Sequence, residues 1–236
     1  EKSFLPELVE ELVRDRSEIK EEMKKAEEGS QELQVLDNRQ QAEKILDELA
    51  EKNKSYSTIK ADFSIKYKNL QSGNYENTSQ GTIIMKGEKY KLDLSRSVIY
   101  YNGTTLWNYM PEVEEVNISE PVQDPEEQDI LNHPNRIFDI YKEDFKYKYL
   151  GQNTQDNTTY HKIDLYPKDL EEDYSRIRLH ISSEDYQIQL ARIFGKDGTR
   201  YTLTIENMEV NQPIDDSAFV FSKADHPNVE VIDMRF

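Results

Sequence analysis

The chain has 236 residues, with 47 acidic against 30 basic side chains and a formal net charge of -17. This charge argues against a nucleic-acid-binding protein, which needs clustered Lys and Arg, and against non-specific adhesion to an anionic membrane. Cysteine is absent, which excludes disulfides, thiol nucleophiles and cysteine-ligated zinc. Hydrophobic residues make up 36% of the chain, enough for a folded core, and no apolar run has the length of a membrane span.

The first 53 residues carry apolar side chains at helical spacing. The first set falls three, four or seven residues apart: Leu5, Leu8, Leu12, Ile19, Met23 and Ala26. Gly29 suits the end of a helix and Ser30 the N-cap of the next one. The second set is Leu33, Val35, Leu36, Ala42, Ile45, Leu46, Leu49 and Ala50, and its helix should end near Asn53. We therefore expect an antiparallel helical hairpin.

After Lys54 the apolar period changes from 3.6 to 2, which predicts β-strands. The first strand contains Phe63, Ile65 and Tyr67, and residues 69–79 are predicted to form a turn-rich connection. Asn102-Gly103 predicts a type I′ hairpin turn, and further turns are expected at Gly87-Glu88 and at residues 195–198. Other strands are predicted at 82–86, 90–94, 98–101, 105–110, 113–118, 145–150, 159–166, 176–182, 187–194, 200–210, 219–221 and 229–232. Strands this close in sequence should be antiparallel.

Residues 121–144 interrupt the strands with three prolines, and one or two short helices are expected there to cross the sheet. The predicted fold is mainly β with helices (α+β). A curved antiparallel sheet of about 11 strands forms an incomplete β-barrel covered by short helices and preceded by the N-terminal hairpin.

Such a curled sheet encloses an apolar hollow. We expect one face to be shared by Phe63, Ile65, Tyr67, Ile83, Met85, Tyr90, Leu92, Leu94 and Tyr109. Trp107 either lines this hollow or packs under a helix as an ordinary buried residue. Met85 and Met110 would add adaptable lining. Ile137, Phe138 and Tyr141 are candidates for a helical plug that a lipid displaces.

One segment then gives the fold a family resemblance. Asn102-Gly103-Thr104-Thr105-Leu106-Trp107-Asn108-Tyr109-Met110-Pro111 resembles the D/N-G-x-x-L-W-x-Y-x-P segment of outer-membrane lipoprotein carriers (LolA-like proteins). The order of the surrounding segments is similar too: a first strand at residues 58–63, a G-x-I strand at Gly81, a mid-chain helix at residues 135–141 and a C-terminal strand at residues 219–221. The resemblance covers about residues 42–236.

This resemblance implies a periplasmic carrier that binds the acyl chains of lipoproteins, or related lipids, in its apolar half-barrel. Its implied partners are an inner-membrane releasing complex and an outer-membrane receptor. The carrier would be a monomer without catalysis or cofactor, and its signal peptide would already have been removed. Where family members carry a basic residue linked to opening and closing, this chain has Gly87-Glu88, so the lid mechanism departs from the pattern.

A second resemblance is confined to residues 4–46, which look like the fingers helical hairpin of family B DNA polymerases. The similar segments are Phe4 to Val9, Arg16 to Lys20, Leu36 to Ala42 and Lys44 to Leu46. The palm carboxylates are missing, which excludes polymerase activity. The chain then divides into a charged hairpin at 1–41, joined ahead of the carrier as a fusion, and a carrier domain at 42–236. The alternative is chance similarity among charged helices.

No catalytic or metal-binding motif stands out. His133, His161, His180 and His226 lie far apart in sequence, and adjacent carboxylates such as Glu114-Glu115 are typical of a solvated surface. A nucleophile elbow, a P-loop and a dinucleotide-binding glycine motif are also missing. Two alternatives to a carrier stay open. One is a sensor or scaffold of the same fold with a filled cavity and a protein partner, and the other is a lipid hydrolase.

Overall fold

A computed structural model describes residues 16, 19–20, 31–71, 75–120, 144–155 and 157–235. Of the first predicted helix, only Arg16, Ile19 and Lys20 are described, and they are helical. The predicted helices over residues 121–143, with Ile137, Phe138 and Tyr141, lie outside the described residues. The first helix of the hairpin and the mid-chain helices therefore stay predictions.

The second predicted helix is confirmed as α2, Gln31–Lys54. The Glu, Gln, Leu, Ala and Lys residues that dominate it have high helix propensities. Lys52 and Lys54 lie in its last turn, at the negative end of the helix dipole. Its apolar positions fall on one stripe, whose buried members are Leu36, Ala42, Ile45, Leu46, Leu49 and Ala50.

The rest of the described chain is almost entirely β-structure, as predicted. The first strands are β1 (Ile59–Asn69), β2 (Tyr75–Lys86), β3 (Lys89–Leu94), β4 (Val98–Tyr101), β5 (Leu106–Met110) and β6 (Glu115–Ser119), with the 3-10 turn η1 (Pro111–Val113) before β6. The later strands are β7 (Phe145–Gln155), β8 (Thr158–Pro167), β9 (Tyr174–Ser182), β10 (Ile188–Gly195), β11 (Thr199–Val210) and β12 (Glu230–Asp233), with the 3-10 turn η4 (Asp216–Phe219) before β12.

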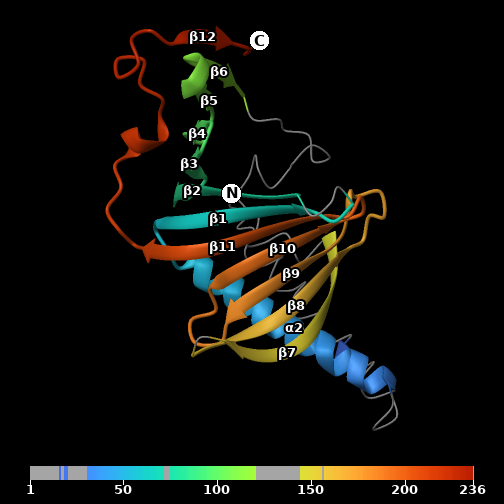
Figure 1. Ribbon diagram of the computed structural model, residues 1–236. Helices are drawn as coiled ribbons and strands as arrows, with labels where there is room; N and C mark the ends of the chain where they lie inside the picture. Colours follow the sequence, from blue (N-terminus) through green and yellow to red (C-terminus); the bar gives the residue numbers. More distant parts are fainter. Residues whose placement is uncertain are drawn as a thin grey trace.

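These strands form one 12-stranded sheet in the order β12-β6-β5-β4-β3-β2-β1-β11-β10-β9-β8-β7. Neighbouring strands are antiparallel, except that β12 runs parallel to β6. β1 and β7–β11 form a broad curved layer with α2 against one side, and β2–β6 continue away from it (Figure 1). We call the side that contacts α2 the inner face and the opposite side the outer face. The predicted open, curved antiparallel sheet is confirmed.

The β4–β5 hairpin turn explains the need for Gly103. Asn102 N–H donates to Thr105 O at 3.3 Å, so the central residues of the turn are Gly103 and Thr104. Only Gly103 has a positive φ, 100°, whereas a type I′ turn needs a positive φ at both central residues. The expected hairpin is confirmed, but the type I′ turn centred on Asn102-Gly103 is wrong. Asn102 instead accepts hydrogen bonds through its side chain from Thr104 and Thr105.

Among the strand bounds that differ from the predictions, two have a clear physical reason. β2 begins at Tyr75, inside the predicted connection, because its start pairs with the end of β1 and Lys66 forms an ion pair with Glu76. Residues 219–221 were predicted as a strand, but Phe219 ends the turn η4 and residues 220–221 are irregular. Their two phenylalanines are buried because they pack onto the sheet from outside: Phe219 is 0% and Phe221 8% exposed.

Gly81 allows β2 to pass beneath an aromatic ring. It lies opposite Phe63 in the register of β1 and β2, and a Cβ atom at Gly81 would stand 2.5 Å from Phe63 Cζ and 2.7 Å from Asp93 O. The Phe63 ring can rotate away, but the Asp93 carbonyl belongs to the backbone of β3 and cannot. The family-like glycine is therefore a packing requirement of this sheet.

The substitution Gly81→Ala should destabilise the protein by about 1–3 kcal/mol, since overpacking forces the neighbouring backbone to shift. The urea midpoint of unfolding measures this change. Ser79→Ala is the matched control, because Ser79 lies two residues away on the same face of β2 and already has a Cβ. Equal midpoints for the two variants would contradict the proposed contact.

Candidate functional site

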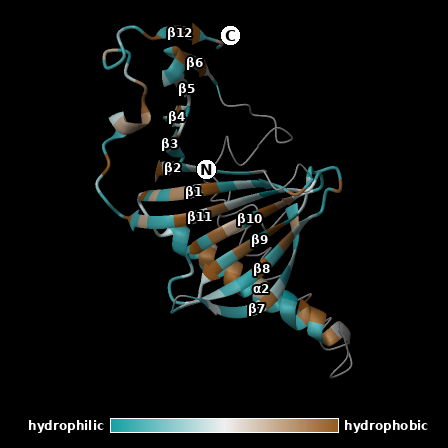
Figure 2. Cartoon of the chain, in the orientation of Figure 1, coloured by the Kyte–Doolittle hydropathy of each residue, from teal (hydrophilic) through white to brown (hydrophobic). Residues whose placement is uncertain are grey.

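The inner face of the sheet is apolar across several strands. The cross-strand register places Ile59 opposite Met85, Met85 opposite Tyr90, and Tyr90 opposite Tyr101. A second row contains Ala61, Ile83, Leu92 and Ile99. Alternation of apolar and polar residues along the strands is visible in Figure 2. The predicted shared face is confirmed for Phe63, Ile65, Tyr67, Ile83, Met85, Tyr90, Leu92 and Leu94.

The helix α2 covers one half of this inner face. Its residues Ala42, Ile45, Leu46, Leu49 and Ala50 form one core cluster with side chains of β7–β10. The strand members are Phe145, Ile163, Leu165, Ile177, Leu179, Ile181, Ile188 and Ala191. Most of these side chains are less than 6% exposed, so this half is a closed core.

The other half of the inner face is only partly covered. Its buried centre consists of Ile59, Phe63, Met85, Tyr90 and Leu92. Around that centre lie half-buried apolar side chains from five strands and the α2–β1 connection: Tyr56, Ile65, Ile83, Leu94, Ile99, Tyr101, Leu203, Ile205, Met208 and Val210. We call this set the open inner face.

The open inner face also stays uncharged. Tyr90 and Tyr101 pack with their ring centroids 5.4 Å apart, and burial raises the pKa of both phenols above the ordinary value of 10.0. Tyr101 donates its hydroxyl hydrogen to Gly103 O at 2.9 Å. Both side chains are therefore neutral at physiological pH, and they offer ring surface to an apolar ligand without an ionic group.

A cavity of about 210 Å³ lies where the two halves meet. Its walls come from the end of α2, the start of β1 and the β2–β3 turn, and they include Ala50, Tyr56, Ile59, Met85, Gly87 and Glu88. Ala50 belongs to the closed core, whereas Ile59 and Met85 belong to the open inner face. The Gly87-Glu88 turn, where the family resemblance implied a switching cation, thus borders this cavity.

Two basic residues flank that turn but point to the outer face. Lys86 Nζ donates to Asp216 Oδ1 at 2.8 Å and to Ile214 O at 2.9 Å, and Lys89 Nζ donates to Asp216 Oδ2 at 2.6 Å. The two lysines hold the pKa of the Asp216 carboxyl at about 2. Both cations therefore bind the C-terminal segment rather than the cavity.

Trp107 and Tyr109 do not lie on the inner face, so the predicted shared face is wrong for Tyr109. Leu94 N–H donates to Ser97 O at 2.9 Å, which pairs Asp93 with Val98 and turns Val98 and Tyr100 outward. Tyr100 pairs with Trp107 and Val98 with Tyr109, so both aromatic residues follow to the outer face. For Trp107, ordinary packing was one of the two interpretations, and it is the one found.

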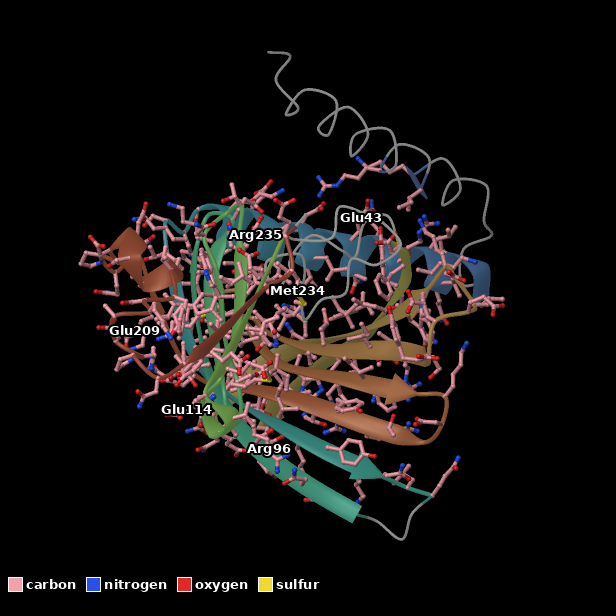
Figure 3. All side chains as sticks on the ribbon, turned by 90° about the horizontal axis from the view of Figure 1, so that it is seen from above. Glu43, Arg96, Glu114, Glu209, Met234 and Arg235 are labelled. Atoms are coloured by element: carbon pink, nitrogen blue, oxygen red, sulfur yellow. The ribbon has the colours of Figure 1, made fainter. Side chains whose placement is uncertain are left out.

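The C-terminal segment covers these outer aromatic residues. Phe221 and Val229 form a core cluster with Val116 of β6, against which Tyr100, Trp107 and Tyr109 pack. The Phe221 ring lies 5.3 Å from that of Tyr109 and 5.2 Å from that of His226. From there β12 runs beside β6 and leads to Met234 and Arg235, both labelled in Figure 3.

Phe221→Ala should destabilise the protein by about 3 kcal/mol, because it removes a ring that is 8% exposed from this cluster. It should also shift the emission of Trp107, the single tryptophan, toward the red by exposing it to water. Urea titration followed by fluorescence measures both effects. Val220→Ala is the control, because that neighbour is 39% exposed, and an unshifted Trp107 emission in Phe221→Ala would contradict the packing.

A tyrosine and a histidine also form a titratable pair on the inner face. Tyr149 Oη and His161 Nδ1 lie 3.0 Å apart, and His161 faces Ile181 in the sheet register. Burial lowers the pKa of His161 below its ordinary 6.5.

Among the described residues, no three His, Asp or Glu side chains come together as ligands of a metal ion. None of the described helices is long and apolar enough to cross a membrane.

The lowered pKa of His161 makes stability depend on pH. Below about 6.5 the unfolded chain takes up a proton more readily than the folded protein, so stability should fall as the pH drops through that value. In His161→Gln, the urea midpoint should decrease less between pH 7.5 and 5.5 than in the parent. Between pH 7.5 and 8.5 the two should change equally. The same decrease in both proteins below pH 6.5 would contradict a neutral buried His161.

Comparison with known families gives two matches. The family model described as "Outer membrane lipoprotein carrier protein LolA" matches residues 54–222. The model of DNA polymerase family B matches residues 1–47, most of which lie outside the described residues. No curated protein matches the chain significantly.

Several solved structures are similar to this chain at low sequence identity. An uncharacterized conserved protein from Thermus thermophilus is 10% identical with a TM-score of 0.54, and the match covers 82% of this chain and 99% of that one. The LolA superfamily protein NE2245 from Nitrosomonas europaea is 16% identical with a TM-score of 0.39, covering 76% and 97%. LprF from Mycobacterium bovis is 12% identical with a TM-score of 0.46, covering 75% and 95%.

Proposed function

Because the chain belongs to the outer membrane lipoprotein carrier (LolA) family, we propose that it binds the acyl chains of lipoproteins or related lipids on its open inner face. It escorts them through the periplasm toward the outer membrane as a monomer and without catalysis. A releasing complex in the inner membrane supplies the lipoprotein, and a receptor in the outer membrane accepts it.

The observation that carries this proposal is the unequal cover of the inner face. α2 closes the half formed by β7–β10, whereas the half around Phe63, Met85 and Leu92 keeps a rim of half-buried apolar side chains. Apolar surface that is left in contact with water is stabilised by an apolar ligand. The proposed acyl contacts are Phe63, Ile65, Tyr67, Ile83, Met85, Tyr90, Leu92 and Leu94, joined by Ile99, Tyr101 and Leu203.

The size of the cavity indicates how the ligand lies. At about 210 Å³ it falls below the 300–1,000 Å³ typical of preformed ligand pockets. An acyl chain therefore extends from the cavity across the open inner face. Each methylene that it buries contributes about 0.8 kcal/mol, so four of them strengthen binding about two hundredfold. Ile137, Phe138 and Tyr141 are proposed to form the plug that the chain displaces.

Adjacent residues of β2 provide a sharp test. Ile83 lies on the open inner face and Ile84 on the outer face, and both are half-buried. Ile83→Asn should weaken the binding of a displaceable fluorescent fatty-acyl probe by about 5- to 150-fold, because an amide without a partner in an apolar site costs about 1–3 kcal/mol. Ile84→Asn should bind the probe as the parent does.

Probe fluorescence should be read rather than Trp107 emission, since Trp107 lies on the outer face. Thermal unfolding of both variants checks that each is folded before binding is measured. Equal loss of affinity in the two variants would place the site elsewhere. If the parent protein shows no displaceable binding of the probe, the carrier proposal is overturned. That result would fit a scaffold with a filled cavity instead.

A further inference from the structure

The outer face of β1 and β7–β11 carries a regular array of basic side chains. One row of directly opposed residues crosses six strands: Lys148, Asp164, Arg178, Arg192, Thr202 and Lys66. The adjacent row contains Arg176, Phe194, Arg200 and Lys68. Lys146 lies on the same face of β7, two residues before Lys148. We call the basic members of these rows, together with Lys146, the basic outer face.

The acidic groups within the array leave most of its charge uncompensated. Asp164 is 1% exposed and accepts from Arg178 Nε at 2.7 Å and Nη2 at 2.8 Å, and Arg176 Nη1 lies 3.7 Å away. Glu76 at the end of the array forms an ion pair with Lys66. The chain as a whole has 47 acidic and 30 basic residues, so the charge of this surface is opposite in sign to the net charge of the protein.

The array is also fixed in position. The guanidinium groups of Arg176 and Arg200 stack on Phe194, with Cζ at 4.1 and 4.9 Å from the ring centroid. The buried Nε of Arg176 has no hydrogen-bond partner among the described residues. Burial lowers the pKa of His180, and Lys162, Arg192 and Arg178 lower it further.

This arrangement works against the stability of the sheet. Arg178 lies directly opposite Arg192, and Arg200 directly opposite Lys68. Like charges at opposed positions of neighbouring strands are destabilising. Asp164 and Phe194 relieve this repulsion in part, and an anion bound from outside would relieve the remainder.

We propose that the basic outer face docks the protein on the surface of an anionic phospholipid membrane. The basic residues come from five strands of a six-stranded stretch and spread in two dimensions, with neighbouring strands roughly 4.8 Å apart, instead of following one groove or strand edge. Such a spread matches an array of lipid phosphates better than a single acidic peptide. Guanidinium groups bind phosphate oxygens through two parallel hydrogen bonds, and α2 and the open inner face point away from this contact.

The contact also sets an orientation. The net charge of -17 repels an anionic bilayer from the protein as a whole, so the region where basic residues gather is the side that can approach. Each Lys or Arg near such a surface strengthens binding about fivefold, and the effect fades beyond a Debye length. This docking does not require acyl binding, and it is tested separately from it.

Two double variants that remove the same charge test the proposal. Lys146→Gln/Lys148→Gln removes exposed cations from the basic outer face, and Lys44→Gln/Lys52→Gln removes exposed cations from α2. Sedimentation with vesicles of phosphatidylglycerol and phosphatidylcholine at low salt measures binding, and vesicles of phosphatidylcholine alone give the background. The first variant should bind about twentyfold more weakly than the parent, and the second about as well as the parent.

Binding to the phosphatidylglycerol vesicles should also weaken steeply with added salt. Absence of charge-dependent binding by the parent would overturn the proposal, and so would equal weakening in both variants. Binding of a poly-glutamate peptide in place of the vesicles would overturn it too, and would assign the surface to an acidic protein partner. The fatty-acyl probe, measured on the same variants, should bind unchanged, which separates this outcome from a failure of the carrier proposal.

Discussion

Among the described residues, α2 is the helix that packs on the apolar inner face of the 12-stranded sheet, and it reaches only the part formed by β7–β10. The 24 residues of α2 present a single apolar stripe, whereas every strand contributes inward side chains by its period of two. The remaining inward side chains, around Phe63 and Met85, are therefore left half-buried. The apolar stripe of α2 is thus narrower than the inner face of the sheet. This difference in width explains the cavity at the junction, the uncharged tyrosines and the proposed acyl site.

Much of this could be predicted from the sequence, because period and turn residues act locally. The bounds of α2 and the inward residues of β1–β3 were predicted correctly since each follows from spacing within one element. The face of β4 and β5 depends instead on how many residues join β3 to β4. Ser95, Arg96 and Ser97 include no Gly, Asn or Pro to mark the turn, and one residue more or less moves a whole strand to the other face. That ambiguity explains the misplaced Tyr109.

The distribution of charge could not be predicted for a related reason. Composition gives the net charge of -17, but lysines and arginines from β1, β7, β9, β10 and β11 become neighbours only through the pairing of β1 with β11 and of β7–β10 with one another. In sequence they stand as isolated cations at alternating positions along their strands, typical of a solvated face. The pairing of strands that are distant in sequence, rather than residue type, brings them together. The resulting surface is positively charged, although the net charge of the chain is negative.

The two halves of the sheet are covered on opposite faces. In the β7–β10 half, α2 closes the inner face and the outer face is exposed and basic. In the β3–β6 half, the C-terminal segment closes the outer face through Phe221 and Val229, anchored by Asp216 on Lys86 and Lys89. The open inner face, on β1–β4 and β11, is left for a ligand, while β1 and β11 carry basic side chains on their outer face. A lipid on the inner face and a phosphate surface on the outer face would therefore bind opposite sides of one continuous sheet, and neither would displace the other.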